Sequence, residues 1–202
     1  MKKVVFVGSG AIGTAVGNVL ARKGIDDITL LSIEEEVVDS INNQRLNINY
    51  FPNIKLSRNL KATTDIEILK DADVIFMAIP STAVVGYLFD KKDYINPTAI
   101  IVNLAKGFGK GDCLIPNCLV GHFPNTLMMM KGPSFAREII NRQETGFTLA
   151  CENNECFGEV ADLFENTNVR FDYSNDINGV EYASILKNIY AIIIGMLDAN
   201  YD

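Results

Sequence analysis

A short apolar run that breaks into glycines near the start of the chain constrains the fold more than any other feature. Residues 4–7 are β-branched or aromatic, which is typical of a buried strand. Gly8, Gly10 and Gly13 follow with the spacing G-x-G-x-x-G, and helix-forming residues continue from Ala11 to Arg22. In such a turn the first glycine allows the bend, the second lets a pyrophosphate approach, and the third lets helix and strand pack closely. The pattern predicts dinucleotide binding; the alternative is a glycine-rich turn that binds nothing.

Length and charge limit the classes of protein that fit. A chain of 202 residues can hold one large domain, or one domain and part of another. A net charge of −7 argues against a nucleic-acid surface, so an anionic ligand would need local lysines or helix N-termini. We find no apolar run of membrane-spanning length and no cleavable signal peptide. These observations predict a cytoplasmic protein without nucleic-acid or membrane partners.

The cysteines do not predict a metal site. Cys113 and Cys118, like Cys151 and Cys156, have the spacing C-x4-C, which is looser than most zinc sites, and the chain has one histidine, His122. We expect ordinary reduced thiols and no metal; the alternatives are a redox pair or a metal site.

Strand and helix patterns alternate along the chain. Strands are expected at 28–31, 61–64, 73–79, 99–103, 126–130, 145–151 and 168–173, and later helices at 34–42, 65–70, 155–165, 179–202 and after Ser134 through Asn141. This order predicts an α/β fold, a doubly wound, mostly parallel sheet of the Rossmann type. Ligands of such sheets bind beyond the carboxyl ends of the strands. Those ends are Gly8–Gly13, Ser32–Glu34, Pro80–Ser81, Lys106–Gly107 and Gly132–Ser134.

Glu34 is the candidate contact for the adenosine ribose. An acidic residue about 20 positions after the glycines commonly accepts hydrogen bonds from the ribose hydroxyls of NAD. Glu34 follows Gly13 by 21 residues and comes after the second strand. The alternative is that it only begins a helix, where a carboxylate complements the dipole. No arginine lies between Arg22 and Arg45 to bind a 2′-phosphate, so we predict NAD rather than NADP as the cofactor.

Lys187 interrupts a final helix that is apolar almost all round and is therefore expected to be buried. At about 100° per residue, the polar residues share about a third of its circumference. They are Glu181, Ser184, Lys187, Asn188, Gly195 and Asp198. Burying an unpaired lysine is costly, so Lys187 should face a cleft, a partner or a ligand. It is a candidate proton-transfer group; the alternative is a lysine that extends to the surface.

A second lysine, Lys106, comes just after the fifth strand, in a position that faces a ligand in doubly wound sheets. Gly132-Pro133-Ser134 opens another helix at the same edge and offers amides and a hydroxyl to an anion. Two lysines and a helix N-terminus around a nicotinamide predict a small phosphorylated or carboxylated substrate.

Several motifs, in order along nearly the whole chain, carry a family resemblance. They are Gly8 to Ala15, Ile41 to Asn47 with Tyr50 and Pro52, Ile79-Pro80-Ser81, Lys106-Gly107, Gly132 to Ala136, Gly179-Val180-Glu181 and Leu186 to Ile192. With these motifs the chain resembles NAD(P)-dependent glycerol-3-phosphate dehydrogenases of the bacterial type. The resemblance implies hydride transfer between NAD(H) and C2 of glycerol 3-phosphate or dihydroxyacetone phosphate. It leaves open whether the protein is a monomer or a homodimer.

The resemblance also implies roles for single residues. Lys187 matches the general base and a substrate contact, and Lys106 the lysine shared by cofactor and substrate. Gly132 and Ser134 match substrate contacts. The cofactor contacts implied or expected from the turn are Gly8, Gly10, Ala11, Ile12, Gly13, Glu34, Pro80, Lys106 and Ala136.

The resemblance implies two regions: an NAD-binding domain over residues 1–175, and the start of a helical substrate domain over 176–202. Family members continue into that domain, which supplies an aspartate and an Arg-Asn pair, so we expect this chain to bind cofactor but turn over poorly. It departs from the family at Ile33, where many members have arginine or histidine, and at 182–184, where Leu-Gly-Gly is common. The rival interpretations are a non-catalytic NAD-binding or regulatory module, and a 2-hydroxyacid dehydrogenase with His122 as its base.

Overall fold

The computed structural model describes residues 2–25, 27–152 and 154–201. Within them, an eight-stranded sheet has the order β3-β2-β1-β4-β5-β6-β7-β8. The strands are β1 Val4–Val7, β2 Ile28–Leu31, β3 Leu60–Thr63, β4 Val74–Met77, β5 Ile100–Asn103, β6 Leu127–Lys131, β7 Thr145–Ala150 and β8 Val169–Ser174. All neighbouring strands are parallel except β6 and β7. The predicted doubly wound, mostly parallel sheet is confirmed.

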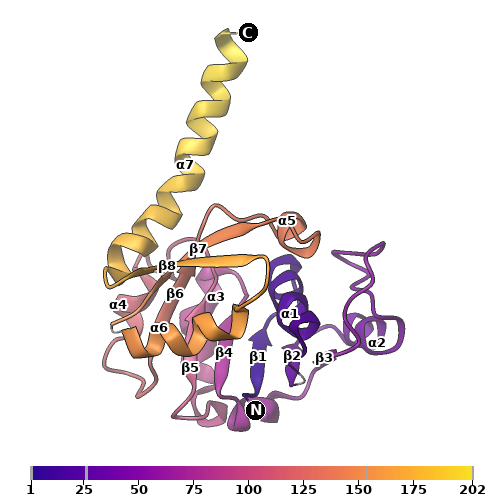
Figure 1. The fold of residues 1–202 in the computed structure, drawn as a ribbon. Helices are drawn as coiled ribbons and strands as arrows, with labels where there is room; N and C mark the ends of the chain where they lie inside the picture. Colours follow the sequence, from indigo (N-terminus) through magenta and orange to yellow (C-terminus); the bar gives the residue numbers. More distant parts are fainter. Residues whose placement is uncertain (1, 26, 153, 202) are drawn as a thin grey trace.

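Helices cover both faces of this sheet (Figure 1). They are α1 Ala11–Lys23, α2 Glu35–Asp39, α3 Ser81–Asp90, α4 Ile115–Leu119, α5 Ala136–Ile140, α6 Asn154–Ala161 and α7 Ile177–Tyr201. Alternate residues of β1 show the two layers: Val4 and Phe6 enter one hydrophobic cluster, and Val5 and Val7 enter the other. In the first cluster the rings of Phe6 and Phe76 stack at 4.5 Å between centroids. Strands buried on both faces explain why their sequences are continuously apolar.

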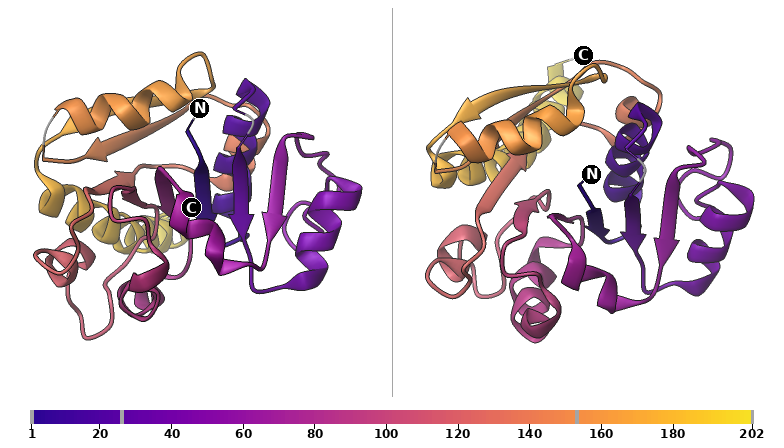
Figure 2. Two further views of the ribbon diagram at one scale, coloured as in Figure 1. Left: turned by 90° about the horizontal axis from the view of Figure 1, so that it is seen from below. Right: turned by 60° about the horizontal axis from the view of Figure 1, so that its bottom comes forward.

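The β1–β4 pair is the point where the chain reverses its direction of winding across the sheet. Val4 pairs with Ile28 on one side and with Val74 on the other. The chain moves from β1 outward to β3, then returns across β1 to β4 and continues outward to β8. Figure 2 shows α6 alongside the β7–β8 strands, at the edge of the sheet opposite α2. A switch point of this kind opens a crevice at the carboxyl ends of the two strands, here β1 and β4.

Three helical segments differ from the sequence prediction. The helix predicted at 34–42 is α2 followed by a π-helical turn, Ser40–Gln44. The helices α3 and α4 were not predicted. α3 contains β-branched and aromatic residues and Gly86, which weaken the local helical signal, and it is positioned by burying Val84 and Leu88. α4 has only five residues, so its periodicity is too short to detect.

The prediction that the last helix is buried is wrong for its second half. The start of α7 packs on β6 and β7, with Glu181 and Ser184 buried, and the rest extends away from the sheet (Figure 1). Ile189, Ile193 and Met196 expose 49%, 46% and 64% of their surface. An exposed apolar surface of this extent is typical of a contact surface.

α7 also corrects the expectation that no apolar run reaches membrane-spanning length. Ile177–Ala199 is 23 residues long, with a mean hydropathy of 1.4, and could cross a membrane by length and composition alone. One helix of this kind is weak evidence for a membrane segment, and its first turns carry buried polar groups that face the sheet.

Cys113 and Cys118 lie side by side, with 6.5 Å between their Cα atoms, so this pair is within reach of a disulfide, and the expectation of reduced thiols stays a prediction. The loop that leads into α4 turns back at Cys113, whose carbonyl oxygen accepts a hydrogen bond from the Gly109 N–H. This turn brings two residues five positions apart within reach of each other.

Candidate active site

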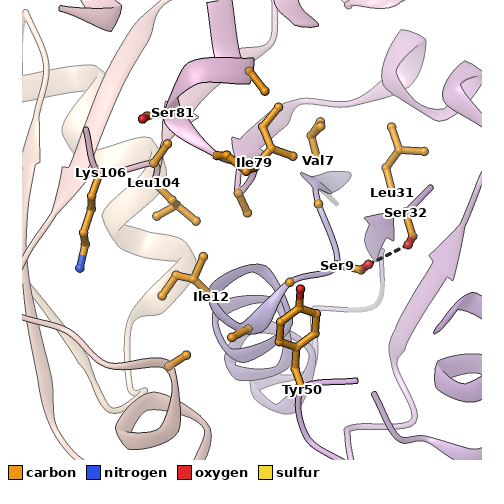
Figure 3. Close-up of a pocket in the computed structure, with 18 of the residues that line it drawn as sticks. Val7, Ser9, Ile12, Leu31, Ser32, Tyr50, Ile79, Ser81, Leu104 and Lys106 are labelled. Carbon is orange, nitrogen blue, oxygen red and sulfur yellow. Dashed lines mark hydrogen bonds between the residues drawn. The ribbon is translucent and has the colours of Figure 1, made fainter. Parts of the chain in front are cut away.

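A cleft of about 780 Å³ lies at the switch point between β1 and β4 (Figure 3). Residues from six separate segments line it, and the segments come together only in the folded chain. Nine of the predicted site residues are in its wall: Gly8, Gly10, Ala11, Ile12, Glu34, Pro80, Lys106, Ser134 and Ala136. Gly13, Gly132 and Lys187 lie outside the lining of this cleft.

Two glycines of the turn are required by packing, and the third leaves open space. Gly8 has φ +109°, and a Cβ there would stand 2.6 Å from the Ala78 carbonyl oxygen. A Cβ on Gly13 would collide with the Gly8 carbonyl oxygen. At Gly10 the nearest atoms are those of the Tyr50 ring, 4.0 Å away. Gly10 is the N-cap of α1 and provides no side-chain cap, so the first amides of α1 are available to an anion.

Glu34 stands at the rim of the cleft, where the end of β2 meets the glycine turn. The Ser32 hydroxyl accepts a hydrogen bond from the Glu34 N–H at 3.1 Å and is 2.7 Å from the Ser9 hydroxyl. The Asn49 side-chain amide donates to Glu34 Oε1 at 3.2 Å. Glu34 is the N-cap residue of α2, but its carboxylate makes no capping hydrogen bond. The side chain is therefore held toward the cleft, while neighbouring Ile33 is 97% exposed.

Lys106 connects the far wall of the cleft to the segment that precedes α5. Its Nζ donates to the Gly132 carbonyl oxygen at 3.1 Å and to the Ser134 carbonyl oxygen at 3.4 Å, and lies 3.5 Å from the Ser134 hydroxyl. Burial lowers the pKa of Lys106 to about 8, and the positive charges of Lys187 and Lys131 act in the same direction. The ammonium group therefore titrates close to neutral pH.

Lys187 approaches the same segment from α7. Its Nζ lies 5.0 Å from the centroid of the Phe135 ring, a cation–π contact. Lys187 also lines a second cavity of about 230 Å³, together with Gly132 and Ser184. A Cβ on Gly132 would collide with the Gly146 carbonyl oxygen of β7, so the packing of two strands requires a glycine there. Both lysines thus contact the 132–135 segment.

A buried ion pair fixes the base of α7 to β6. Lys131 Nζ lies 2.9 Å from Glu181 Oε2, with the two side chains 3% and 0% exposed. Lys131 also donates to the Ala105 carbonyl oxygen, directly before Lys106. Glu181 Oε1 has no hydrogen-bond partner among the described residues. Burial lowers the pKa of Lys131 and raises the pKa of Glu181, because low dielectric penalises both charges.

Comparison with known proteins identifies the family. The family model described as NAD-dependent glycerol-3-phosphate dehydrogenase N-terminus matches residues 3–157. The chain belongs to this family. The glycerol-3-phosphate dehydrogenase [NAD(P)+] of Leptospira biflexa is 37% identical over 97% of the chain and 60% of the relative. The protein of the same name from Bacillus subtilis is 35% identical over 98% of the chain and 59% of the relative.

A solved structure agrees with this assignment. The crystal structure of glycerol-3-phosphate dehydrogenase from Coxiella burnetii has a TM-score of 0.89 and 29% identity, and the match covers 98% of this chain and 61% of that chain. The chain therefore spans about 60% of the length of the relatives that it matches. The predicted family resemblance is confirmed.

Two parts of the candidate site were missed by sequence reasoning. Lys131 was not singled out, although a charge at the end of the apolar run 127–130 is a signal of a buried pair. The buried amide of Asn47 bonds to the glycine turn, although its position in a long polar connection gave no sign of burial. The alternative of a histidine base is not supported, because His122 packs edge-on against Phe89, outside the cleft lining.

Proposed function

We propose that this chain binds NAD in the switch-point cleft, as the dinucleotide-binding part of an enzyme that transfers hydride between NAD(H) and C2 of glycerol 3-phosphate or dihydroxyacetone phosphate. The observation that carries the proposal is the convergence of Lys106 and Lys187 on the 132–135 segment, at one end of the cleft. A glycine-rich turn that binds nothing would not need two lysines there.

Gly8, Gly10 and Gly13 would form the pyrophosphate site, with the amides of Ala11 and Ile12 directed at the phosphates. Glu34 would accept hydrogen bonds from the adenosine ribose. Pro80, Lys106 and Ala136 would contact the nicotinamide half. Glu34 and the exposed Ile33 favour NAD over NADP, because a carboxylate repels a 2′-phosphate and isoleucine offers it no cation.

Lys187 is the proposed proton-transfer group. When bound, the nicotinamide supplies the hydride acceptor or donor. The neutral Lys187 amine would take the proton from the C2 hydroxyl of glycerol 3-phosphate as hydride leaves C2. In the reverse direction its ammonium would protonate the carbonyl oxygen of dihydroxyacetone phosphate. Lys106, Gly132 and Ser134 would hold the phosphorylated substrate next to it.

We divide the chain into an NAD-binding domain, residues 1–175, and the start of a helical substrate domain, residues 176–202. The exposed apolar surface of α7 supports this division, because such a surface suits contact with further structure. Since the chain spans about 60% of its relatives, we infer that it binds cofactor but turns over slowly by itself. We also propose that it acts in the cytoplasm.

A Gly10→Val substitution tests the cofactor site. Gly10 has φ −66°, and its Cβ position is open toward the cleft, so valine should leave the fold intact and fill the space of the pyrophosphate. Gly86→Val is the matched control, because Gly86 lies outside the cleft lining and has no atom within 4 Å of its Cβ position. Calorimetric titration with NADH should show binding to the parent and control but not to the Gly10 variant. Equal affinity in all three proteins would refute the site.

A further inference from the structure

Asn47, in the long connection between α2 and β3, is 0% exposed, and its side-chain amide uses all four of its hydrogen-bonding positions. Nδ2 donates to the Ser9 carbonyl oxygen at 2.7 Å and to the Thr14 hydroxyl at 2.8 Å. Oδ1 accepts from the backbone N–H groups of Asn49 at 3.2 Å and of Tyr50 at 3.3 Å. One amide therefore joins the glycine turn to residues 47–50.

On the glycine-turn side, these bonds fix one peptide plane. The Ser9 carbonyl oxygen accepts a hydrogen bond from Asn47 and a second, at 3.0 Å, from the Thr14 hydroxyl. The C=O and N–H of one trans peptide point in opposite directions. Holding the Ser9 carbonyl toward Asn47 therefore also fixes the direction of the Gly10 N–H, which lies in the turn that lines the cleft.

On the loop side, the same amide supports two side chains at the cleft. Tyr50 lines the cleft beside the start of α1 (Figure 3), and its ring is the nearest neighbour of the Gly10 Cβ position, at 4.0 Å. Asn49 donates to the Glu34 carboxylate. Both N–H groups donate to Asn47 Oδ1, and the Tyr50 N–H also donates to the Asn47 backbone carbonyl oxygen at 3.3 Å, so the loop is held as an Asx-type turn.

We propose that Asn47 is a positioning residue for the dinucleotide: its buried amide holds the pyrophosphate turn and residues 49–50 as one unit before the ligand arrives. The proposal rests on the proposed binding of NAD in this cleft. Because a preformed unit does not have to be ordered when the ligand binds, binding loses less conformational entropy and the affinity is higher. Asn47 itself touches no part of the cleft surface.

A purely structural role predicts a loss of stability without a loss of affinity, and Asn18 provides the comparison. Asn18 is also 0% exposed, and its Oδ1 accepts from the Ser57 N–H at 2.7 Å, at the other end of the same connection. Asn18 lies outside the lining of the cleft. An Asn18→Ala substitution should destabilise the fold without affecting the glycine turn.

The test is titration of the whole chain with NADH and with ADP-ribose, which lacks the nicotinamide, alongside urea unfolding. Asn47→Ala should weaken both ligands by about tenfold or more, equivalent to about 1.4 kcal/mol. Asn18→Ala should leave both affinities within about twofold of the parent. Asn47→Asp keeps the two acceptor contacts but places a buried carboxylate oxygen against the Ser9 carbonyl oxygen, so it should lower the free energy of unfolding as well as weaken both ligands. Asn47 variants that bind both ligands as tightly as the parent would overturn the proposal.

Amide hydrogen exchange in the ligand-free chain separates this proposal from the proposed function. If Asn47 holds the unit, Asn47→Ala should accelerate exchange at the Asn49 and Tyr50 amides, which donate to Asn47 Oδ1, and Asn18→Ala should not. A parent chain that binds neither ligand would refute the dinucleotide site itself. Unchanged exchange in the Asn47 variant would refute the preformed unit whatever the parent binds.

Discussion

Removing one partner of the buried Lys131–Glu181 pair should cost far more than removing both. In Lys131→Met, Glu181 keeps a carboxylate with no exposed surface and loses its ion-pair partner. Breaking a buried pair from one side typically costs about 3–5 kcal/mol, because the remaining charge stays desolvated. The Ala105 carbonyl oxygen also loses a donor, which adds about 1 kcal/mol. Folded domains are stable by only about 5–15 kcal/mol, so the variant should retain little net free energy of unfolding.

The double variant Lys131→Met/Glu181→Leu removes both charges and keeps similar volumes. Exchanging a buried pair for apolar side chains is often neutral or stabilising. We expect the double variant to lie within about 2 kcal/mol of the parent, with the Ala105 carbonyl as the remaining cost. The sum of the losses in unfolding free energy of the two single variants should therefore greatly exceed the loss of the double variant.

Acid should partly rescue the Lys131→Met variant. Burial raises the pKa of Glu181 in the folded chain, and without Lys131 nothing opposes that effect. The folded state then takes up a proton at a higher pH than the unfolded state, so the free energy of unfolding rises as pH falls through the carboxyl range. The loss caused by Lys131→Met should be largest near pH 7.5 and smaller near pH 5.

The assay is urea unfolding followed by far-UV circular dichroism, because the chain has no tryptophan. The parent, both single variants and the double variant are compared at pH 5 and pH 7.5. Coupling between the two charges is refuted if either single substitution lowers the free energy of unfolding by less than about 1 kcal/mol. It is also refuted if the losses of the two single variants sum to the loss of the double variant. The acid rescue is refuted if acid weakens Lys131→Met relative to the parent.

Three further predictions concern the proposed reaction. Dissociation constants measured on the parent chain should favour NADH over NADPH, and Glu34→Ala should narrow the difference; a parent that prefers NADPH would contradict the cofactor assignment. In a full-length enzyme, Lys187→Ala should leave NADH affinity nearly unchanged and lower kcat by about 10² to 10⁴, so a near-normal kcat would exclude proton transfer by this lysine. Affinity for glycerol 3-phosphate in that enzyme should fall as pH rises through about 8, where Lys106 loses its proton; Lys106→Met should bind weakly at every pH, and a wild-type affinity independent of pH would argue against the contact.

Local sequence patterns determined the strands of this protein and the edge at which they end, although they did not reveal α3 and α4. The run Val4–Val7, the three glycines and the following helix are a contiguous signal, because burial of a strand and the bend of a turn depend on neighbouring residues. The alternation of elements then placed Glu34 and Lys106 at one edge of a parallel sheet. Both residues line the cleft that the structure contains.

The partners of the polar side chains were decided by tertiary structure alone. Asn47 meets Ser9 across 38 positions, Lys106 meets Gly132 across 26, and Lys131 meets Glu181 across 50. No period in the sequence encodes such pairs, since they depend on strand order and on where a connection folds back. The exposure of α7 has the same origin: its composition indicates a buried helix, but only packing decides which surface covers it. Periodicity is a property of neighbours in the chain, and a binding site is a property of neighbours in space.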